Sequence, residues 1–182
     1  MSFFSIKKGL EILQKNNVPE NIINHSMKVN QVAVYIAEKL HNAGEQVNIS
    51  IVNDASLLHD IDKHLSLKGK KHGEEAPRML REAGMERIIP IVSKHFLHTI
   101  LESGEKGLNS WEEKIVYYAD KRVVHDNIVS LDERFAYLKQ RYGQSNPSFV
   151  EMLENCKPKL KALEEEIFSK INESTELASL KD

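Results

Sequence analysis

The sequence predicts an all-α protein made of one compact bundle of about seven helices. Apolar residues recur at intervals of three and four, as in the series Val29, Val32 and Ile36, which is the period of a helix with one buried face. No stretch alternates apolar and polar residues for long enough to predict a convincing strand. Capping residues, glycine and proline separate the periodic segments, where helices would begin and end.

Four helices are expected in the first half of the chain: about 3–15, about 19–42, a third that leads into 59–60 and ends near 68–70, and about 72–83. Pro19 suits the first turn of the second helix, because the missing N–H of proline costs nothing there. Gly44 follows this helix and can supply a left-handed closing residue. Gly84 marks the end of the fourth helix.

Three more helices are expected in the second half: one from about 85 to the glycine-rich loop 103–107, one from 110 through 120, and one from 147 to about 172. Ser110 and Glu113 have the spacing of a capping box, and Asn146 is the cap of the last helix. The residues after 172 are expected to be frayed. The chain 1–182 is therefore predicted to be a single domain, with its core at about 18–142 and a C-terminal helix at about 147–172.

Size and composition fit one globular domain. The 182 residues are 41% hydrophobic and 29% charged, which is ordinary for a protein with a single core. The longest apolar runs fall well short of a membrane span, and the amino terminus lacks the long apolar stretch of a secretory signal. We therefore expect a cytoplasmic protein without a membrane partner.

Net charge limits the kinds of partner that the chain can bind, and the cysteine count limits the kinds of metal ligand that it can offer. A net charge of −2 and a pI near 6.5 argue against nucleic acid, which needs a broad basic surface. A small molecule is the expected partner, and the sequence sets no oligomeric state. The single cysteine, Cys156, can form neither an internal disulfide nor a thiolate cluster. Any bound metal must therefore use histidine and carboxylate ligands.

Two ionisable residues fall on buried faces of expected helices. His25 precedes Val29 by four residues and so lies on the core stripe of its helix. A lone histidine there is more often a hydrogen-bonded core residue than a metal ligand. Asp120 shares a stripe with Val116 and Val123, and a buried carboxylate is costly unless it is paired or coordinates a cation. Its basic neighbours, residues 121 and 122, are expected to point to other faces, so a metal is the better partner.

The order of the motifs adds a family resemblance. A helix-borne His25 is followed by Leu57-Leu58-His59-Asp60 and, in a later helix, by Tyr117-Tyr118-Ala119-Asp120. A His-Asp pair alone is a frequent accident, although adjacent ligands can reach one ion at a helix end. The ordered set, over about 22–142, resembles the HD superfamily of metal-dependent phosphohydrolases. This resemblance implies a helical HD domain with a metal site.

Within that superfamily, residues 57–63 resemble the subgroup with a His-Asp-Ile-Gly-Lys signature, and residues 112–121 resemble its closing motif. The chain departs from the signature at Asp62, where glycine is usual, so a substrate cannot be carried over from relatives. The resemblance implies a core of four metal ligands: His25, His59, Asp60 and Asp120. In relatives with two metals, further histidines come from a His-Gly or His-Ala helix start and from the following helix. The matching residues here are His72 and His95, so two ions are favoured over one.

A ligand set of this kind suits Mn, Fe, Co, Ni or Zn better than Mg alone. Such an ion lowers the pKa of bound water and polarises a phosphoryl oxygen, so we predict hydrolysis of a phosphate ester or anhydride, of a nucleotide or a related small molecule. Asp60 is also the candidate to orient the attacking water. The candidates to contact substrate are Lys63, Lys121, Arg122 and His98. A structural salt bridge is an equal expectation for Arg122, and a surface position for His98.

Two other functions stay open. A di-iron oxygenase is permitted by His72 and His95, but the surroundings of Lys63 and Lys121 favour phosphate. A module that senses nucleotide without turnover is the other alternative, and the intact ligand set argues against it.

Overall fold

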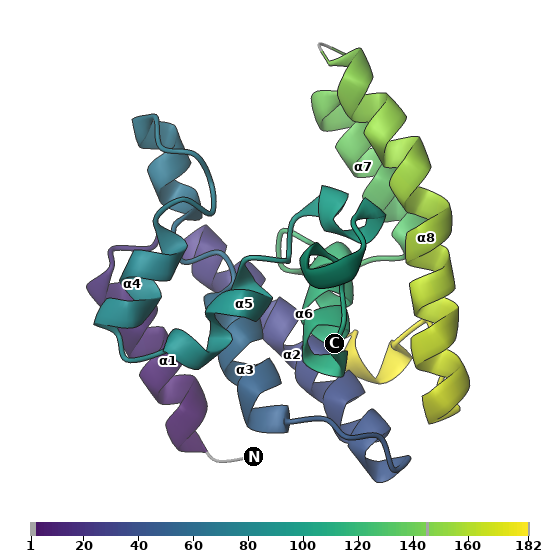
Figure 1. Ribbon diagram of the computed structural model, residues 1–182, viewed down its shortest axis with the longest axis horizontal. Coiled ribbons are helices and arrows are strands. Elements are labelled where there is room, and N and C mark those ends of the chain that lie inside the picture. The colour runs from purple at the N-terminus through teal and green to yellow at the C-terminus, as the bar shows by residue number, and fades with distance from the viewer. Residues whose placement is uncertain (1–2, 145, 182) are drawn as a thin grey trace.

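The computed structural model describes residues 3–144 and 146–181 of the chain (Figure 1). The α-helices in these residues are α1 (Phe3–Lys15), α2 (Glu20–Asn42), α3 (Ile49–Leu58), α4 (Ala76–Glu82), α5 (Ile89–Val92), α6 (Trp111–Lys121), α7 (Leu131–Tyr142) and α8 (Pro147–Ile171). Short 3-10 segments lie between or after them: η1 (Lys63–Lys68), η2 (Glu86–Ile88), η3 (Leu97–Leu101), η4 (Gly104–Lys106) and η5 (Ala178–Leu180). Two short strands, β1 (Val123–Val124) and β2 (Asn127–Ile128), pair antiparallel with Val123 opposite Ile128. The prediction of an all-α fold is confirmed.

Helix α2 forms the centre of the fold, with α3 and α6 packed against it and against each other (Figure 1). Its predicted apolar stripe is buried, with Val29, Val32 and Ile36 all at 0% exposure. Helix α1 packs on α3, where a β-carbon at Gly9 would come within 2.3 Å of Leu57 Cδ2. Helix α8 packs against α7, α2 and η3. The start of α2 meets the ends of α3 and α6, and the candidate ligands lie at this meeting point.

Side chains cap several of the helices. The predicted capping box of α6 is present, because Ser110 accepts a hydrogen bond from the Glu113 amide and the Glu113 carboxylate accepts one from the Ser110 amide. The Asn146 side chain accepts from the Phe149 amide at 3.1 Å and caps α8. These polar residues satisfy amides that a helix leaves without a partner in its first turn.

Two helices next to the His-Asp pair are shorter than predicted. Helix α3 ends at Leu58 instead of near residue 68, because His59 is its C-cap and a turn leads into η1. Helix α4 begins at Ala76 and not at His72, since Gly73 has a φ of +89° that a right-handed helix excludes. His72 therefore lies in a loop before α4.

The helix predicted from residue 85 is also broken. Pro90 stands in the first turn of α5, which holds only residues 89–92. Phe96 is extended, with ψ 147°, before η3 begins. His95 consequently lies in the turn after α5, and His98 lies in η3 rather than on a continuous helix.

An eighth helix, α7, was missed by the prediction of seven. It begins at a second capping box in which Ser130 and Glu133 exchange hydrogen bonds. The expectation of a frayed tail is also wrong, because Leu177 is 2% exposed and the Thr175 carbonyl accepts a hydrogen bond from Arg122. The C-terminal segment is thus held against the body of the protein.

Candidate metal centre

The side chains predicted to bind metal come together from separate parts of the fold. Their ligand atoms form two groups, and within each group these atoms lie within 4.8 Å of one another. The first group is His25, His59 and Asp120, and the second is Asp60, His72 and His95.

The Asp60 carboxylate joins the two groups. Its Oδ2 atom lies 3.8 Å from His25 Nε2 and 3.5 Å from His59 Nε2. Its Oδ1 atom lies 3.1 Å from His72 Nε2 and 3.4 Å from His95 Nε2. Asp60 is only 1% exposed, so its two oxygens are fixed toward different groups of histidines. One carboxylate can therefore serve both groups.

Backbone carbonyls hold three of the histidine rings by their Nδ1 atoms. The pairs are His25 with the His125 carbonyl (2.7 Å), His59 with the Ser56 carbonyl (2.7 Å) and His95 with the Val92 carbonyl (2.6 Å). A carbonyl oxygen only accepts hydrogen bonds, so each Nδ1 is the donor, and Nε2 is the ring atom left to ligate a metal at the centre. This is how histidine ligands are oriented in metalloproteins.

Three of the four histidine Nε2 atoms that face the centre lack hydrogen-bond partners. Those of His59, His72 and His95 are buried and make no hydrogen bond to any part of the chain that the structure describes. The fourth, His25 Nε2, lies 3.1 Å from Asp120 Oδ1. Buried polar atoms in native proteins are normally satisfied. A cation between the imidazoles and carboxylates would satisfy the three atoms that lack a partner, so this donor set fits a divalent metal.

Both central carboxylates are ionised. Burial alone would raise the pKa of Asp60, but the neighbouring His59 and Lys63 outweigh it and hold that pKa well below its usual range. Burial would also raise the pKa of Asp120, but the charge of Lys121 outweighs it and holds that pKa well below its usual range. Two buried negative charges thus face the histidines, as a cation site requires.

Two lysines contact these carboxylates. Lys63 Nζ lies 2.5 Å from Asp60 Oδ2, and its side chain is 43% exposed. Lys121 Nζ lies 2.5 Å from Asp120 Oδ2 and donates to the His95 carbonyl at 2.6 Å. The expectation that residue 121 points away from Asp120 is therefore wrong. Burial lowers the pKa of Lys121, although Asp120 opposes the shift.

Two predicted substrate residues are not brought to the centre. Arg122 is 1% exposed and donates to the carbonyls of Val129 and Thr175 and to Glu164. It ties the hairpin, α8 and the C-terminal segment together, which matches the structural alternative. His98 is exposed, with its ring stacked 6.1 Å from that of Phe96.

Asp62, which replaces the signature glycine, has a structural role that the sequence did not reveal. Its Oδ2 atom accepts backbone N–H groups from Gly73 (2.9 Å), Glu75 (3.0 Å) and Ala76 (3.0 Å). Its Oδ1 atom lies 3.6 Å from His72 Nε2. The carboxylate therefore holds both the loop that carries His72 and the first residue of α4.

Two cavities flank the centre, with volumes of about 210 and 180 Å³. The first opens on the His25 side and the second on the His72 and His95 side. Five residues line both: Asp60, Lys63, Arg134, Leu138 and Tyr142. Arg134, on α7, was not predicted as a site residue. The capping box at the start of α7 was the available signal, but it does not show which way the helix faces.

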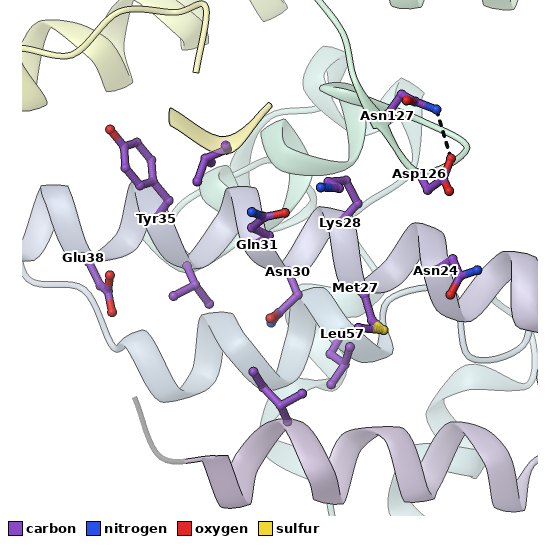
Figure 2. Close-up of a pocket in the computed structure, with 13 residues that line it drawn as sticks. Asn24, Met27, Lys28, Asn30, Gln31, Tyr35, Glu38, Leu57, Asp126 and Asn127 are labelled. Atoms are coloured by element: carbon purple, nitrogen blue, oxygen red, sulfur yellow. Dashed lines mark hydrogen bonds between the residues drawn. The ribbon is translucent and has the colours of Figure 1, made fainter. Parts of the chain in front are cut away.

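A larger groove of about 760 Å³ lies along α2, away from the metal centre (Figure 2). Asn30, Gln31 and Tyr35 of α2 and Leu57 of α3 contribute to its lining. None of the candidate metal ligands lines it. The candidate metal chemistry therefore lies at the two smaller cavities and not in this groove.

The HD-domain family model matches residues 22–123 of the chain. The chain belongs to the HD-domain family. The match includes all the candidate metal ligands, and the family is a superfamily of metal-dependent phosphohydrolases. Arg134 and the rest of α7 lie beyond it.

Two named proteins are similar to the chain. An uncharacterized protein of Methanocaldococcus jannaschii is 29% identical over 157 residues, which cover 81% of this chain and 92% of that protein. A tRNA (cytidine(56)-2'-O)-methyltransferase of Thermoplasma volcanium is 31% identical over 134 residues, which cover 68% of this chain but only 38% of that enzyme. No solved structure gives a significant match.

Among the helices that the structure describes, none combines the length and the apolar character that a membrane span needs.

Proposed function

We propose that the chain is a metal-dependent phosphohydrolase that cleaves a phosphate ester or anhydride of a small molecule such as a nucleotide. The observation that carries the proposal is the set of buried Nε2 atoms of His59, His72 and His95, which have no hydrogen-bond partner among the described residues. They face the ionised carboxylates of Asp60 and Asp120. Family membership supports the same chemistry.

His25, His59 and Asp120 would hold one ion, and His72 and His95 a second, with Asp60 serving both. Nitrogen and oxygen donors of this kind suit Mn, Fe, Co, Ni or Zn. When bound, such ions acidify water and neutralise negative charge that develops on the phosphoryl group. Lys121 is a positioning residue in this arrangement, because its ammonium joins Asp120 to the carbonyl of His95.

Lys63 is the chain's own candidate for contact with the phosphate. Its ammonium reaches Asp60, its side chain is partly exposed, and it lines both cavities. An ammonium cannot ligate a cation, but it donates charge-assisted hydrogen bonds to phosphate oxygens. The lysine therefore sits where a phosphate approaching Asp60 would meet it.

The alternatives fit less well. An oxygenase would use the same histidines, but cations such as Lys63 and Arg134 in the cavity walls favour an anionic substrate. The tRNA methyltransferase name belongs to a relative of which the chain covers little more than a third. The net charge of −2 favours a small phosphorylated molecule over tRNA.

The test combines metal analysis with a screen of phosphorylated compounds. Purified protein loaded with manganese should retain the metal through desalting and release phosphate from at least one compound. His98→Ala is the control for loss of a histidine outside the centre, because His98 is exposed and lines neither cavity. It should retain both the metal and the activity. A protein that retains no metal, or that retains it and releases no phosphate from any compound of the screen, would contradict the proposal.

A further inference from the structure

We propose that the cavity on the His25 side binds a second phosphate group of the substrate, so that the substrate class carries two neighbouring phosphates. We call it the α7 cavity, and its lining is Asn21, Ile22, His25, Asp60, Lys63, His125, Arg134, Tyr137, Leu138, Arg141 and Tyr142. This inference rests on the proposed function, because the first phosphate is the one hydrolysed at the metal centre.

One face of α7 forms the wall of this cavity. Arg134, Leu138 and Arg141 line it at steps of four and three residues, the spacing that places side chains on one face of a helix. Lys139 lies on another face, where it pairs with Glu154 at 3.1 Å. Helix α7 therefore contributes two guanidinium groups to the lining of the cavity, and its one lysine forms a surface ion pair.

The charges of the cavity are unbalanced. Three lining residues are cations, namely Lys63, Arg134 and Arg141, and the single carboxylate in the lining is Asp60. Asp60 already contacts Lys63 and the histidines of the centre. The α7 cavity thus has more positive charge than its own acidic groups can neutralise, which favours an anion.

Neither arginine has a carboxylate within hydrogen-bond distance among the described residues. Arg134 Nε is buried without a hydrogen-bond partner in the described chain, and Arg134 Nη2 reaches Asp120 Oδ1 only at 4.0 Å. Arg141 makes no ion pair with any carboxylate of the described residues. Its Nη1 donates a hydrogen bond to the Tyr137 hydroxyl, and its guanidinium lies 5.8 Å and 5.4 Å from the ring centres of Tyr137 and Tyr142. Guanidinium groups with free donors at a cavity match the oxygens of a phosphate.

The size of the cavity limits what can enter. Its volume of about 210 Å³ is below the roughly 300–1,000 Å³ of cavities that hold a whole small-molecule ligand. A phosphate group fits better than a complete nucleotide. The second cavity has apolar walls from Phe96, Leu97 and Phe149, which suit the remaining organic part. Arg134 borders both cavities, so one guanidinium can contact both phosphates.

The experiment compares two probes on manganese-loaded protein by titration calorimetry: inorganic phosphate and methylenediphosphonate, a diphosphate analogue that water does not cleave. The wild-type protein should bind methylenediphosphonate at least about tenfold more tightly than phosphate, since a lost charge-assisted hydrogen bond corresponds to roughly 10- to 150-fold in affinity. Free manganese is buffered at one value throughout, so chelation in solution cancels when variants are compared.

Arg141→Ala should weaken methylenediphosphonate binding about 10- to 100-fold and change phosphate binding less than about threefold. Arg134→Ala should weaken both probes, and Arg134→Lys should restore part of the loss because it keeps the charge. Lys139→Ala is the matched control on the same helix, and both affinities should stay unchanged. Arg141 is exposed, so its removal should not disturb folding, which circular dichroism checks.

Equal loss of both probes in Arg141→Ala, no loss of either, or the same loss in Lys139→Ala would overturn the inference while leaving the proposed function intact. A wild-type protein that binds phosphate and methylenediphosphonate equally would overturn it too. A protein that takes up no manganese would overturn the proposed function and this inference together.

Discussion

Replacing Asp62 by alanine should both destabilise the protein and weaken the part of the centre that His72 forms. The Asp62 carboxylate is 2% exposed and accepts three backbone N–H groups from the loop before α4 and its first residue. Alanine removes the acceptor and puts nothing in its place. The loop that carries His72 would then be held by fewer contacts.

The size of the effect follows from where the three amides lie. A side-chain cap stabilises a helix by about 0.5–2 kcal/mol, and a buried amide left without an acceptor costs about 1–3 kcal/mol. Only the Ala76 amide is buried; those of Gly73 and Glu75 are partly exposed and can turn to water. The free energy of unfolding should therefore fall by about 2–3 kcal/mol. For a chain of this length, that lowers the Tm by roughly 4–12 °C.

The effect on metal binding should be selective. Asp62 holds the His72 loop but contacts no residue of the first group, His25, His59 and Asp120. Loss of a group that orients a ligand typically weakens metal affinity about 10- to 100-fold. The affinity of the proposed ion at His72 and His95 should fall by that factor, and the proposed ion at His25, His59 and Asp120 should be retained.

Urea unfolding of metal-free protein, followed by far-UV circular dichroism, measures the stability. Titration with manganese measures the two affinities. Asp62→Asn keeps one acceptor oxygen and should lose about half as much stability. Asp132→Ala is the matched control, because Asp132 is an exposed carboxylate paired with Lys157 and Lys161, and it should stay within about 0.5 kcal/mol of wild type. The reasoning is refuted if the free energy of unfolding of Asp62→Ala also stays within about 0.5 kcal/mol of wild type and the variant binds both ions with normal affinity.

Three further outcomes are expected. His59→Ala or Asp60→Ala should abolish metal binding and phosphatase activity with helical content largely intact, as metal analysis, assay and circular dichroism would show; full retention of metal and turnover would contradict the site. Elemental analysis of manganese- or iron-loaded protein should approach two ions per chain, and a firm value of one would reduce the centre to a single site. Lys63→Ala should keep its metal and lower kcat/KM about 10- to 150-fold, with kcat falling as well; unchanged steady-state kinetics would leave Lys63 as a structural partner of Asp60.

The candidate metal ligands could be singled out from the sequence because local patterns place them. The spacing of His25 from Val29 and of Asp120 from Val116 puts each on a buried helix face. The order of the motifs then indicated His59 and the remaining ligands through the family resemblance. The geometry agrees, since the structure brings all of them together.

Side chains that reach across turns could not be predicted in this way. Lys121 follows Asp120 directly, and neighbouring helix positions diverge by about 100°, so it was expected to point elsewhere. Its long, flexible stem nevertheless carries Nζ to Asp120 Oδ2 and to the carbonyl of His95. Asp62 shows the same limit, because its partners lie 11 to 14 residues further along the chain. Helical periodicity carries no information about contacts of this kind.

The wall of the α7 cavity depends on a tertiary feature that lies outside any motif. After Asp120 the chain turns through the β1–β2 hairpin, where His125 adopts a positive φ of 56°, a conformation that histidine adopts more readily than most residues. The His125 carbonyl fixes the ring of His25, and the His125 ring packs edge-on against Tyr137 of α7 at 5.6 Å. The same turn therefore orients a candidate metal ligand and contacts α7 beside the centre. The alignment of His25 and the placement of Arg134 are thus linked through one hairpin, which explains how a helix outside the family match becomes part of the candidate site.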